Sequence, residues 1–363
     1  MKAACFPGHS MTKINQQLIA DRLNLSRTTV SRCFTNHPKI NPETRAAVFQ
    51  VAAEMGYGYQ APRNVVARKP AERSTIAVLI GVPRSQRDAV ETASQMLKGI
   101  SERAAAANLE IQIHYIDAGE FRLAPRARRI LPGVSSADWK GLILLYPFEE
   151  ETVGNLMAKF PTVSVLDDYD TVDVDCINPD ETRGISRMVQ HLYEQGHRRI
   201  GFLSWKYRVH TPWVERRLGA YVENLYRLGL DFDPKLVLNV RQSDHVPLDT
   251  LSGEVARLVR EGVTGWVCAA DHQAYRLLGD LITLGVKVPE ECSITGFDGV
   301  QPPEGMPRLT TVRQPFRDMG LSAVVSLLRR SADPSSPRRH VLVSCREIIG
   351  ETTSAAPGLH AVR

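Results

Sequence analysis

Residues 18–57 read LIADRLNLSRTTVSRCFTNHPKINPETRAAVFQVAAEMGY, and this stretch decides how the chain begins to fold. Asn15 and Ser26 are residue types that cap helix N-termini, and apolar residues recur at helical spacing after each of them. We therefore expect one helix over residues 16–23 and a second over residues 27–34. Two short helices separated by about three residues have the geometry of a helix-turn-helix.

A third helix is expected from Asn41-Pro42-Glu43, which supplies an N-cap, a proline in the first turn and an acid near the helix N-terminus. Gly56 is expected to end it. Its apolar stripe consists of Ala47, Val48, Val51, Ala52 and Met55. Three short helices bury only a small core, so their function lies in the surface that they present.

Positive charge is concentrated at the start of the chain. Residues 1–73 contain eleven Lys or Arg and four Asp or Glu, whereas the remaining residues contain 34 Lys or Arg and 36 Asp or Glu. A basic small domain on a near-neutral larger one favours nucleic acid as a partner. The second predicted helix exposes Arg27, Thr28, Ser31 and Arg32; arginine binds guanine edges in the major groove, and threonine binds phosphates or a thymine methyl. The alternative, a solvated polar helix face, is disfavoured by the three-helix spacing and the local charge.

Residues 18–57 resemble the headpiece of lactose-repressor-type (LacI/GalR) transcription factors. The shared elements are Ala20, Ser26-x-x-Thr29-Val30-Ser31-Arg32, Asn36, Ile40-x-x-Glu43-Thr44-Arg45 and Gly56-Tyr57. The resemblance implies that double-stranded operator DNA is read mainly by Arg27, Thr28 and Arg32. It implies phosphate contacts by Thr29, Ser31 and Asn36 and by groups near Asn15, Ser26, Asn41 and Tyr57. The family normally starts just before the first helix, so Met11 is a candidate start and residues 1–11 an extension.

Residues 58–74 form a basic linker between the headpiece, residues 12–57, and the rest of the chain. By composition this is a flexible tether. In the family that this sequence resembles, the segment is a hinge helix that inserts a leucine between base pairs from the minor groove. Here Val66 takes the place of that leucine and Arg63 is the neighbouring basic contact, but Pro62 falls where the short helix would run.

Several classes of protein are excluded by the composition. No stretch approaches the ~20 apolar residues of a membrane span, and no signal peptide is visible. The six cysteines are scattered without a C-x-x-C pair, which is typical of reduced thiols in a cytoplasmic protein, so neither zinc nor another metal site is expected. No glycine-rich dinucleotide or phosphate-loop motif follows a predicted strand, and no cofactor is expected.

From residue 75 onward, buried strands alternate with amphipathic helices, which predicts a doubly wound α/β fold. The expected strands cover residues 76–80, 109–113, 141–145, 162–166, 200–203, 266–269 and 292–296. The expected helices cover residues 90–107, 149–159, 181–195, 213–228, 248–261, 271–284 and 316–329. Gly196-His197-Arg198-Arg199-Ile200 and Gly296-Phe297-Asp298 resemble the regulatory half of the same family, which has a periplasmic-binding-protein-like fold of two subdomains. The resemblance implies an N-subdomain of about 75–178 and 314–340, a C-subdomain of about 179–311 and 341–353, and a tail from 354 to 363.

Ligands of open α/β sheets bind at the carboxyl ends of strands, and polar or aromatic residues gather there in this sequence. Carboxylate and guanidinium groups bind sugar hydroxyls, and aromatic rings stack on sugars. The resemblance implies that Arg216 and Asp298 bond the hydroxyls of an effector and that Tyr146, Asp167 and Phe316 line its cleft. Further candidates are Asp271, which alternatively caps a helix, and Trp205 and Trp213, which form either a stacking wall or a packed loop. Two polar contacts of the family are absent, at Leu145 and Ala270.

The resulting prediction is a homodimeric, operator-binding repressor whose DNA affinity is controlled by a small molecule, most simply a sugar. Arg216 and Arg217 leave a phosphorylated sugar open as the effector, and a purine or a protein also remains an alternative. The alternatives outside transcriptional regulation are a sugar-processing enzyme and an exported solute receptor. Asp167 and Asp168 are adjacent carboxylates, but no metal-ligand or catalytic-triad spacing accompanies them. His197 and His272 are isolated, and His197 is best interpreted as a structural residue at a helix end.

Overall fold

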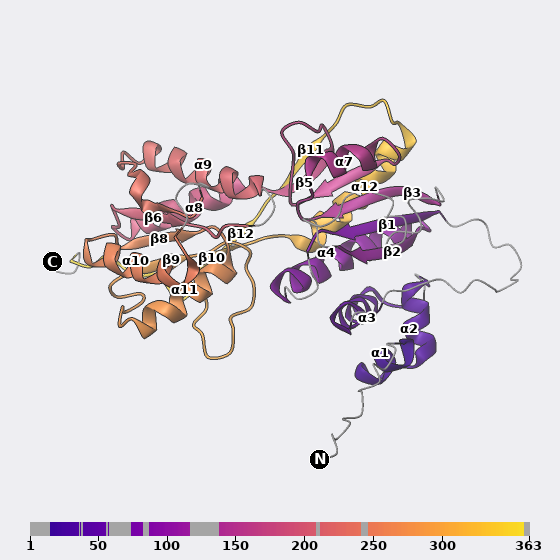
Figure 1. Cartoon of the computed structure of the whole chain (residues 1–363), viewed down its shortest axis with the longest axis horizontal. Coiled ribbons are helices and arrows are strands. Elements are labelled where there is room, and N and C mark those ends of the chain that lie inside the picture. Colours follow the sequence, from indigo (N-terminus) through magenta and orange to yellow (C-terminus); the bar gives the residue numbers. More distant parts are fainter. Residues whose placement is uncertain are drawn as a thin grey trace, which may run out of the picture.

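The computed structural model describes residues 15–35, 37, 39–55, 57, 74–82, 87–116, 138–207, 211–240 and 246–358. Figure 1 shows two α/β lobes side by side, with the helical headpiece beneath the lobe that contains the first strands. The chain passes from one lobe to the other and back, because the long helix near its C-terminus lies in the first lobe and the last strand in the second. We call these lobes the N-subdomain and the C-subdomain. Within the described residues, no helix is long and apolar enough to cross a membrane.

The headpiece consists of α1 (Gln16–Arg22), α2 (Arg27–Phe34) and α3 (Pro42–Met55), which confirms the three predicted helices. The caps form as predicted: the Asn15 side chain accepts from the backbone N–H of Gln17 and Leu18, and Ser26 accepts from Thr29 N–H. The Asn41 carboxamide accepts from Thr44 N–H at 2.6 Å. The core lies where the three helices meet and is made of Ile19, Ala20, Val30, Cys33, Val48, Val51 and Ala52.

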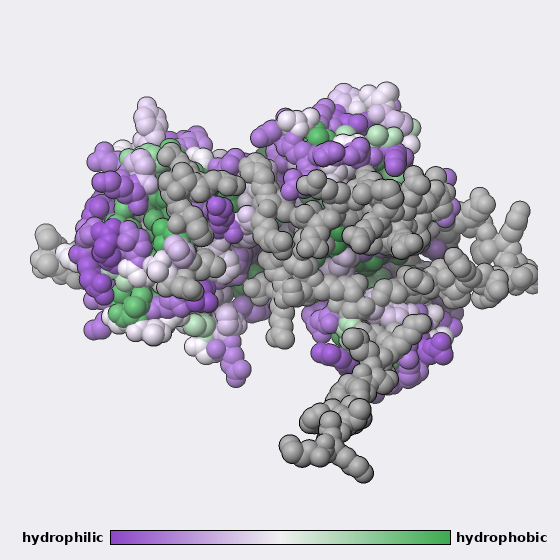
Figure 2. Space-filling view, viewed as in Figure 1, coloured by the Kyte–Doolittle hydropathy of each residue, from purple (hydrophilic) through white to green (hydrophobic). Residues whose placement is uncertain are grey.

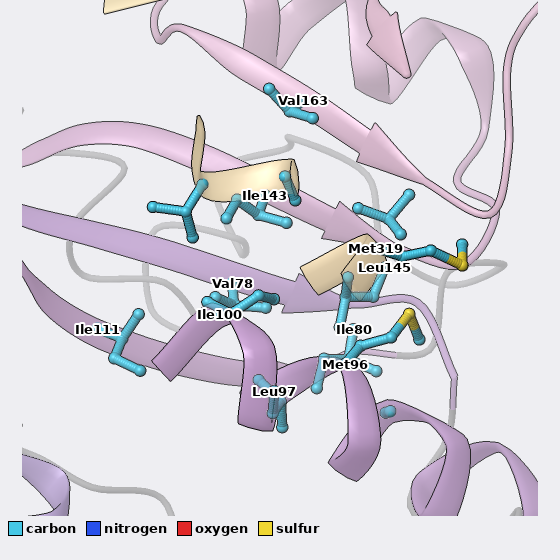
Figure 3. Packing of buried hydrophobic residues seen from close by; sticks show 14 of the residues in the cluster. Val78, Ile80, Met96, Leu97, Ile100, Ile111, Ile143, Leu145, Val163 and Met319 are labelled. Carbon is cyan, nitrogen blue, oxygen red and sulfur yellow. The ribbon is translucent and has the colours of Figure 1, made fainter. Parts of the chain in front are cut away.

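The N-subdomain is built on a parallel six-stranded sheet of order β11-β5-β4-β3-β1-β2. Its strands are β1 (Thr75–Ile80), β2 (Glu110–Tyr115), β3 (Trp139–Leu145), β4 (Thr162–Val165), β5 (Asp175–Pro179) and β11 (His340–Val343). Helices α4 (Arg87–Ala106) and α12 (Phe316–Ala332) cover one face, and α7 (Glu150–Met157) covers the other. Figure 3 shows the first face, where Val78 and Ile143 of the sheet approach Ile100 of α4 and Met319 of α12 lies near Leu145.

The C-subdomain contains a parallel four-stranded sheet of order β7-β6-β8-β9. Its strands are β6 (Ile200–Leu203), β7 (Val237–Leu238), β8 (Gly265–Cys268) and β9 (Ser293–Thr295). Helices α8 (Glu181–Glu194) and α9 (Pro212–Arg227) pack on one face, and α10 (Leu248–Arg260) and α11 (Asp271–Thr283) on the other. A short 3-10 helix, η1 (Pro234–Leu236), precedes β7. Both subdomains are therefore doubly wound, as the alternation of strands and helices predicted.

Sequence patterning located each of the seven predicted strands but missed β5, β7, β10 (Thr311–Arg313), β11 and β12 (Arg346–Ile348). These strands are short, or they contain polar residues and proline, so they lack a recognisable apolar run. The pairing of β11 with β5 also moves one boundary: residues up to Val343 belong to the N-subdomain, whereas the prediction ended that segment near residue 340. The β10–β12 pair is antiparallel and belongs with the C-subdomain, since Thr310 bridges to Thr295.

The headpiece packs against α4 of the N-subdomain. Arg45 of α3 is 1% exposed, and its guanidinium donates to Ser101 Oγ at 2.7 Å and to two carbonyl groups of the headpiece. Phe49 of α3 joins the same apolar cluster as α4, and Lys98 of α4 pairs with Glu43 at 3.2 Å. On the face shown in Figure 2, most of the described surface is hydrophilic and its apolar patches are small.

Candidate functional site

The strand order of each sheet indicates where a ligand binds. In the N-subdomain, the chain order reverses between β1 and β3, and in the C-subdomain it reverses between β6 and β8. Ligands of open parallel sheets bind outside the carboxyl ends of strands at such a point. The segments that leave these ends carry most of the predicted effector residues, namely Tyr146, Asp167, Trp205, Asp271 and Asp298.

Arg216 joins the two subdomains through ion pairs. It lies on α9 of the C-subdomain, and its guanidinium meets Asp167 at 3.5 Å and Asp168, both of which follow β4 of the N-subdomain. Its Nε also donates to Glu181 Oε2 at 2.6 Å. The predicted pair of Arg216 and Asp167 is thus brought together. Asp167 is fully buried, and burial raises the pKa of its carboxyl well above the usual range, against the opposing effect of Arg216.

Arg217, which the sequence offered only beside Arg216 as a contact for an anionic effector, and Glu181, which sequence reasoning did not select, form the buried centre of this cluster. The Arg217 guanidinium stacks over the rings of Phe297 at 3.9 Å and Trp213 at 4.4 Å, and its Nε donates to Glu181 at 3.1 Å. It also lies 3.7 Å from Asp298. Burial raises the pKa of Glu181 to about 7, although Arg217 lowers it. The available signal was the adjacent Arg216-Arg217 pair, but spacing alone does not show that one of the two points inward.

Asp271 and Asp298 have different surroundings although both follow strands. The Asp271 carboxylate is fully buried and accepts from the N–H groups of Gly299 and Val300 and from the Thr311 hydroxyl. Its oxygens therefore bond mainly to the protein, as the alternative structural role of Asp271 at the helix start requires, and a direct contact with an effector stays a prediction. Asp298 has a positive φ of 139° and accepts from the Gln314 side chain at 2.6 Å. Burial raises the pKa of both carboxyls.

The aromatic residues after β6 pack on one another and on the site. The Trp205 ring contacts His272 edge-on at 4.8 Å between centroids, and Tyr207 contacts Trp213 at 5.4 Å. The Tyr207 hydroxyl accepts from Gln273 at 2.8 Å and lies 3.1 Å from His272 Nε2. Packing and ligand stacking both fit this arrangement, so a stacking wall stays a prediction.

Two predicted lining residues belong more to the N-subdomain core than to a cleft. Phe316, the first residue of α12, is 3% exposed and lies in the apolar cluster with α4 and the sheet, because an apolar ring at this helix start is covered by the neighbouring strands. Its expected place in a cleft stays a prediction. Tyr146 has a φ of 70° directly after β3 and packs partly against the same cluster.

The predicted DNA-reading surface of α2 is exposed. Arg27, Thr28 and Arg32 are exposed, whereas Ser31 and Thr29 are half-buried and Thr29 Oγ1 lies 2.8 Å from Ser26 Oγ. Tyr57 packs against Phe34 with 5.5 Å between ring centroids. Asn36, Arg63 and Val66 lie outside the described residues. The base and phosphate contacts of all these residues stay predictions.

His197 has the structural environment that its position suggested. It is fully buried, its Nδ1 lies 2.8 Å from Thr264 Oγ1, and its Nε2 lies 3.0 Å from Ser293 Oγ. In the described part of the chain, the acidic, histidine and cysteine side chains do not gather into a group suited to hold a metal ion.

Comparisons with known proteins agree with this architecture. A family model described as bacterial regulatory proteins, lacI family, matches residues 17–59, and a periplasmic binding protein-like domain matches residues 189–353. The HTH-type transcriptional repressor CytR of Escherichia coli K12 is 27% identical over 348 residues, covering 93% of this chain and 96% of that protein. The regulator MalR of Streptomyces coelicolor is 32% identical over 192 residues, covering 50% of this chain and 53% of that protein.

Solved structures show the same fold. A complex of the transcriptional regulator CelR with cellobiose aligns with a TM-score of 0.65 at 20% identity, covering 94% of this chain and 100% of that one. The lac repressor dimer bound to operator and the anti-inducer ONPF aligns with a TM-score of 0.62 at 20% identity, covering 95% and 100%.

Proposed function

This chain is a DNA-binding transcriptional regulator of the lacI family, and from that premise we propose that it is a cytoplasmic repressor whose operator affinity is controlled by a sugar bound between its subdomains. The observation that carries the proposal is the meeting of Arg216 from the C-subdomain with Asp167 and Asp168 from the N-subdomain. These groups lie where both sheets end, so a ligand bound there touches both subdomains and changes the angle between them.

The chemistry of the cluster favours a hydroxyl-rich ligand. Carboxylate and guanidinium groups bind vicinal hydroxyls with directed hydrogen bonds, and half-buried aromatic rings at Trp205 and Trp213 offer faces for stacking. The structurally similar CelR was solved with cellobiose, which supports a sugar for this chain as well. The relatives and structural neighbours are transcriptional regulators, which supports a sensor rather than an enzyme.

The proposed DNA complex is a homodimer on a near-palindromic operator. Each α2 enters the major groove of one half-site, because a two-fold protein matches a two-fold DNA site. Phosphate contacts dominate such binding, so operator affinity is expected to fall steeply as salt rises. Effector binding alters the subunit arrangement and hence the spacing of the two headpieces, with a coupling free energy of ~1–3 kcal/mol.

Thermal-shift screening of sugars tests the proposal. A sugar that is the effector raises the unfolding temperature of the wild type, since it binds only the native state. The Asp298→Ala protein loses that shift, whereas Asp231→Ala, an exposed acid elsewhere in the C-subdomain, keeps it. The stabilising sugar must also change the affinity for an operator selected from random DNA. If no sugar stabilises the wild type, the sugar proposal is wrong.

A further inference from the structure

The candidate effector site contains more acids than bases, and its bases are already engaged. Its carboxyl groups are those of Asp167, Asp168, Glu181, Asp271 and Asp298, and the guanidinium groups in contact with them are those of Arg216 and Arg217. His340 Nδ1 lies 3.9 Å from Asp168, and His272 contacts Tyr207. An arginine pair alone would attract an anion, but these carboxylates surround it.

Each arginine donates through its Nε and one terminal nitrogen to a carboxylate or a carbonyl. The Nε groups of Arg216 and Arg217 both donate to Glu181, one to each oxygen. One terminal nitrogen of Arg216 donates to Asp168, and one of Arg217 donates to the Ala269 carbonyl. A phosphate entering the site would have to displace acids from both arginines and would be repelled by those acids that are ionised.

The polar atoms left without a partner show what the site does accept. Arg216 Nη2 is a buried donor without a hydrogen-bond partner, and Asp167 Oδ2 is a buried acceptor without one. The two side chains approach to 3.5 Å. A hydroxyl both accepts and donates a hydrogen bond, so adjacent hydroxyls satisfy both atoms, whereas an ionised phosphate oxygen only accepts. Gln273 and Gln314 add two more unpartnered buried acceptor oxygens, which also need donors.

We propose that Asp168 and Glu181 determine effector specificity: by occupying Arg216 and Arg217, they make the site select an uncharged, hydroxyl-rich effector and reject a phosphorylated one. This inference rests on the proposed sugar-binding function and excludes the anionic alternative. Asp168 is the better residue to vary, because its side chain is 28% exposed while that of Glu181 is 3% exposed. Replacing Asp168 by asparagine removes the negative charge beside Arg216 without leaving a large cavity.

The experiment compares wild type, Asp168→Asn and the matched control Asp173→Asn. Asp173 lies on the same loop, is exposed and forms none of the site's ion pairs. Each protein is titrated by calorimetry and thermal shift with inorganic phosphate and with hexoses and disaccharides paired with their 6-phosphates. The wild type and Asp173→Asn should prefer a neutral sugar to its phosphate by at least about tenfold. In Asp168→Asn this preference should shrink by about tenfold, and inorganic phosphate should bind measurably for the first time.

The outcomes separate this inference from the proposed function. A wild type that binds a sugar phosphate as tightly as the parent sugar overturns the inference and leaves sugar sensing intact. An Asp168→Asn protein that is folded by circular dichroism yet gains no affinity for inorganic or sugar phosphate overturns the role of Asp168. A wild type stabilised by no sugar of either class overturns the proposed function, while the inorganic phosphate titration still decides whether Asp168 masks Arg216.

Discussion

At the scale of single residues, burial decides which acids face a ligand. Asp271 and Asp298 both follow strands, but Asp271 holds two backbone N–H groups of the turn at Gly299 and Val300. That turn carries Asp298 in a backbone conformation that residues other than glycine seldom adopt. Asp271 therefore acts on the site through Asp298, which supports a positioning role. With three donors and no exposed surface, this carboxylate is largely satisfied by the protein itself.

The first prediction concerns Arg27 on the exposed face of α2. Replacing Arg27 by alanine should weaken binding to the best operator by ~1–3 kcal/mol and relax the base preference at one position. Fluorescence titration with a selected operator and its single-base variants measures both effects. Arg227→Ala, an arginine that is 66% exposed on α9, should leave both unchanged. Unaltered operator binding by Arg27→Ala would show that this residue does not read DNA.

The second prediction concerns pH. Burial raises the pKa of Glu181 to about 7 from 4.5, so between these values the folded protein keeps a proton that the unfolded chain has released. The free energy of unfolding should therefore fall as pH rises from about 4.5 to 7. Glu181→Gln removes this titration, so urea unfolding of that variant should show a smaller decrease over the window. An equal decrease in both proteins would mean that Glu181 titrates normally.

At the scale of elements, the α4–α12 pair depends on two glycines that sequence patterning did not distinguish. A Cβ at Gly99 would lie 1.9 Å from the Arg317 carbonyl oxygen, and one at Gly320 would lie 2.1 Å from that of Met96. The two backbones therefore touch where the helices cross. The chain returns from the C-subdomain immediately before α12 begins. The close crossing therefore holds this returning segment against α4, the helix that contacts the headpiece.

The third prediction follows from that crossing. Gly99→Ala should destabilise the protein by ~1–3 kcal/mol, because the helices must separate to admit the methyl group. Gly219→Ala on α9 is the control: a Cβ there meets nothing within 4 Å, and alanine should stabilise the helix by up to ~1 kcal/mol. Urea unfolding compares the two variants. Equal stability of Gly99→Ala and wild type would contradict the close crossing.

At the scale of the whole molecule, two polar contacts among the described residues anchor the headpiece to the sensor. Arg45 is buried against Ser101, and Glu43 pairs with Lys98 on the exposed side of the same contact. A hydrogen bond from a buried charged group contributes more than an exposed ion pair, so the Arg45–Ser101 bond is the stronger anchor.

The fourth prediction is that Ser101→Ala releases the headpiece. Loss of the bond should cost ~1.5–3 kcal/mol of the docking free energy and make the linker after Tyr57 more susceptible to limited proteolysis. Ser331→Ala on α12 is a matched control, since that exposed serine is remote from the headpiece and its hydroxyl makes a long hydrogen bond, at 3.5 Å, to the Lys140 carbonyl. The same cleavage rate in Ser101→Ala and wild type would show that this bond does not hold the headpiece.

The sequence by itself determined the elements whose signals are local. Caps at Asn15, Ser26 and Asn41 and the apolar stripes they precede specify the headpiece, and the alternation of apolar runs with amphipathic helices specifies two doubly wound subdomains. Only the tertiary structure decided which polar residues share a site. The roles of Glu181, Arg217 and Asp271 depend on contacts between residues far apart in the chain, and periodicity carries no information about such contacts. The ligand preference of the effector site likewise depends on the folded cluster. Arg216 by itself would attract an anion, whereas Arg216 surrounded by the acids of the cluster prefers hydroxyl groups.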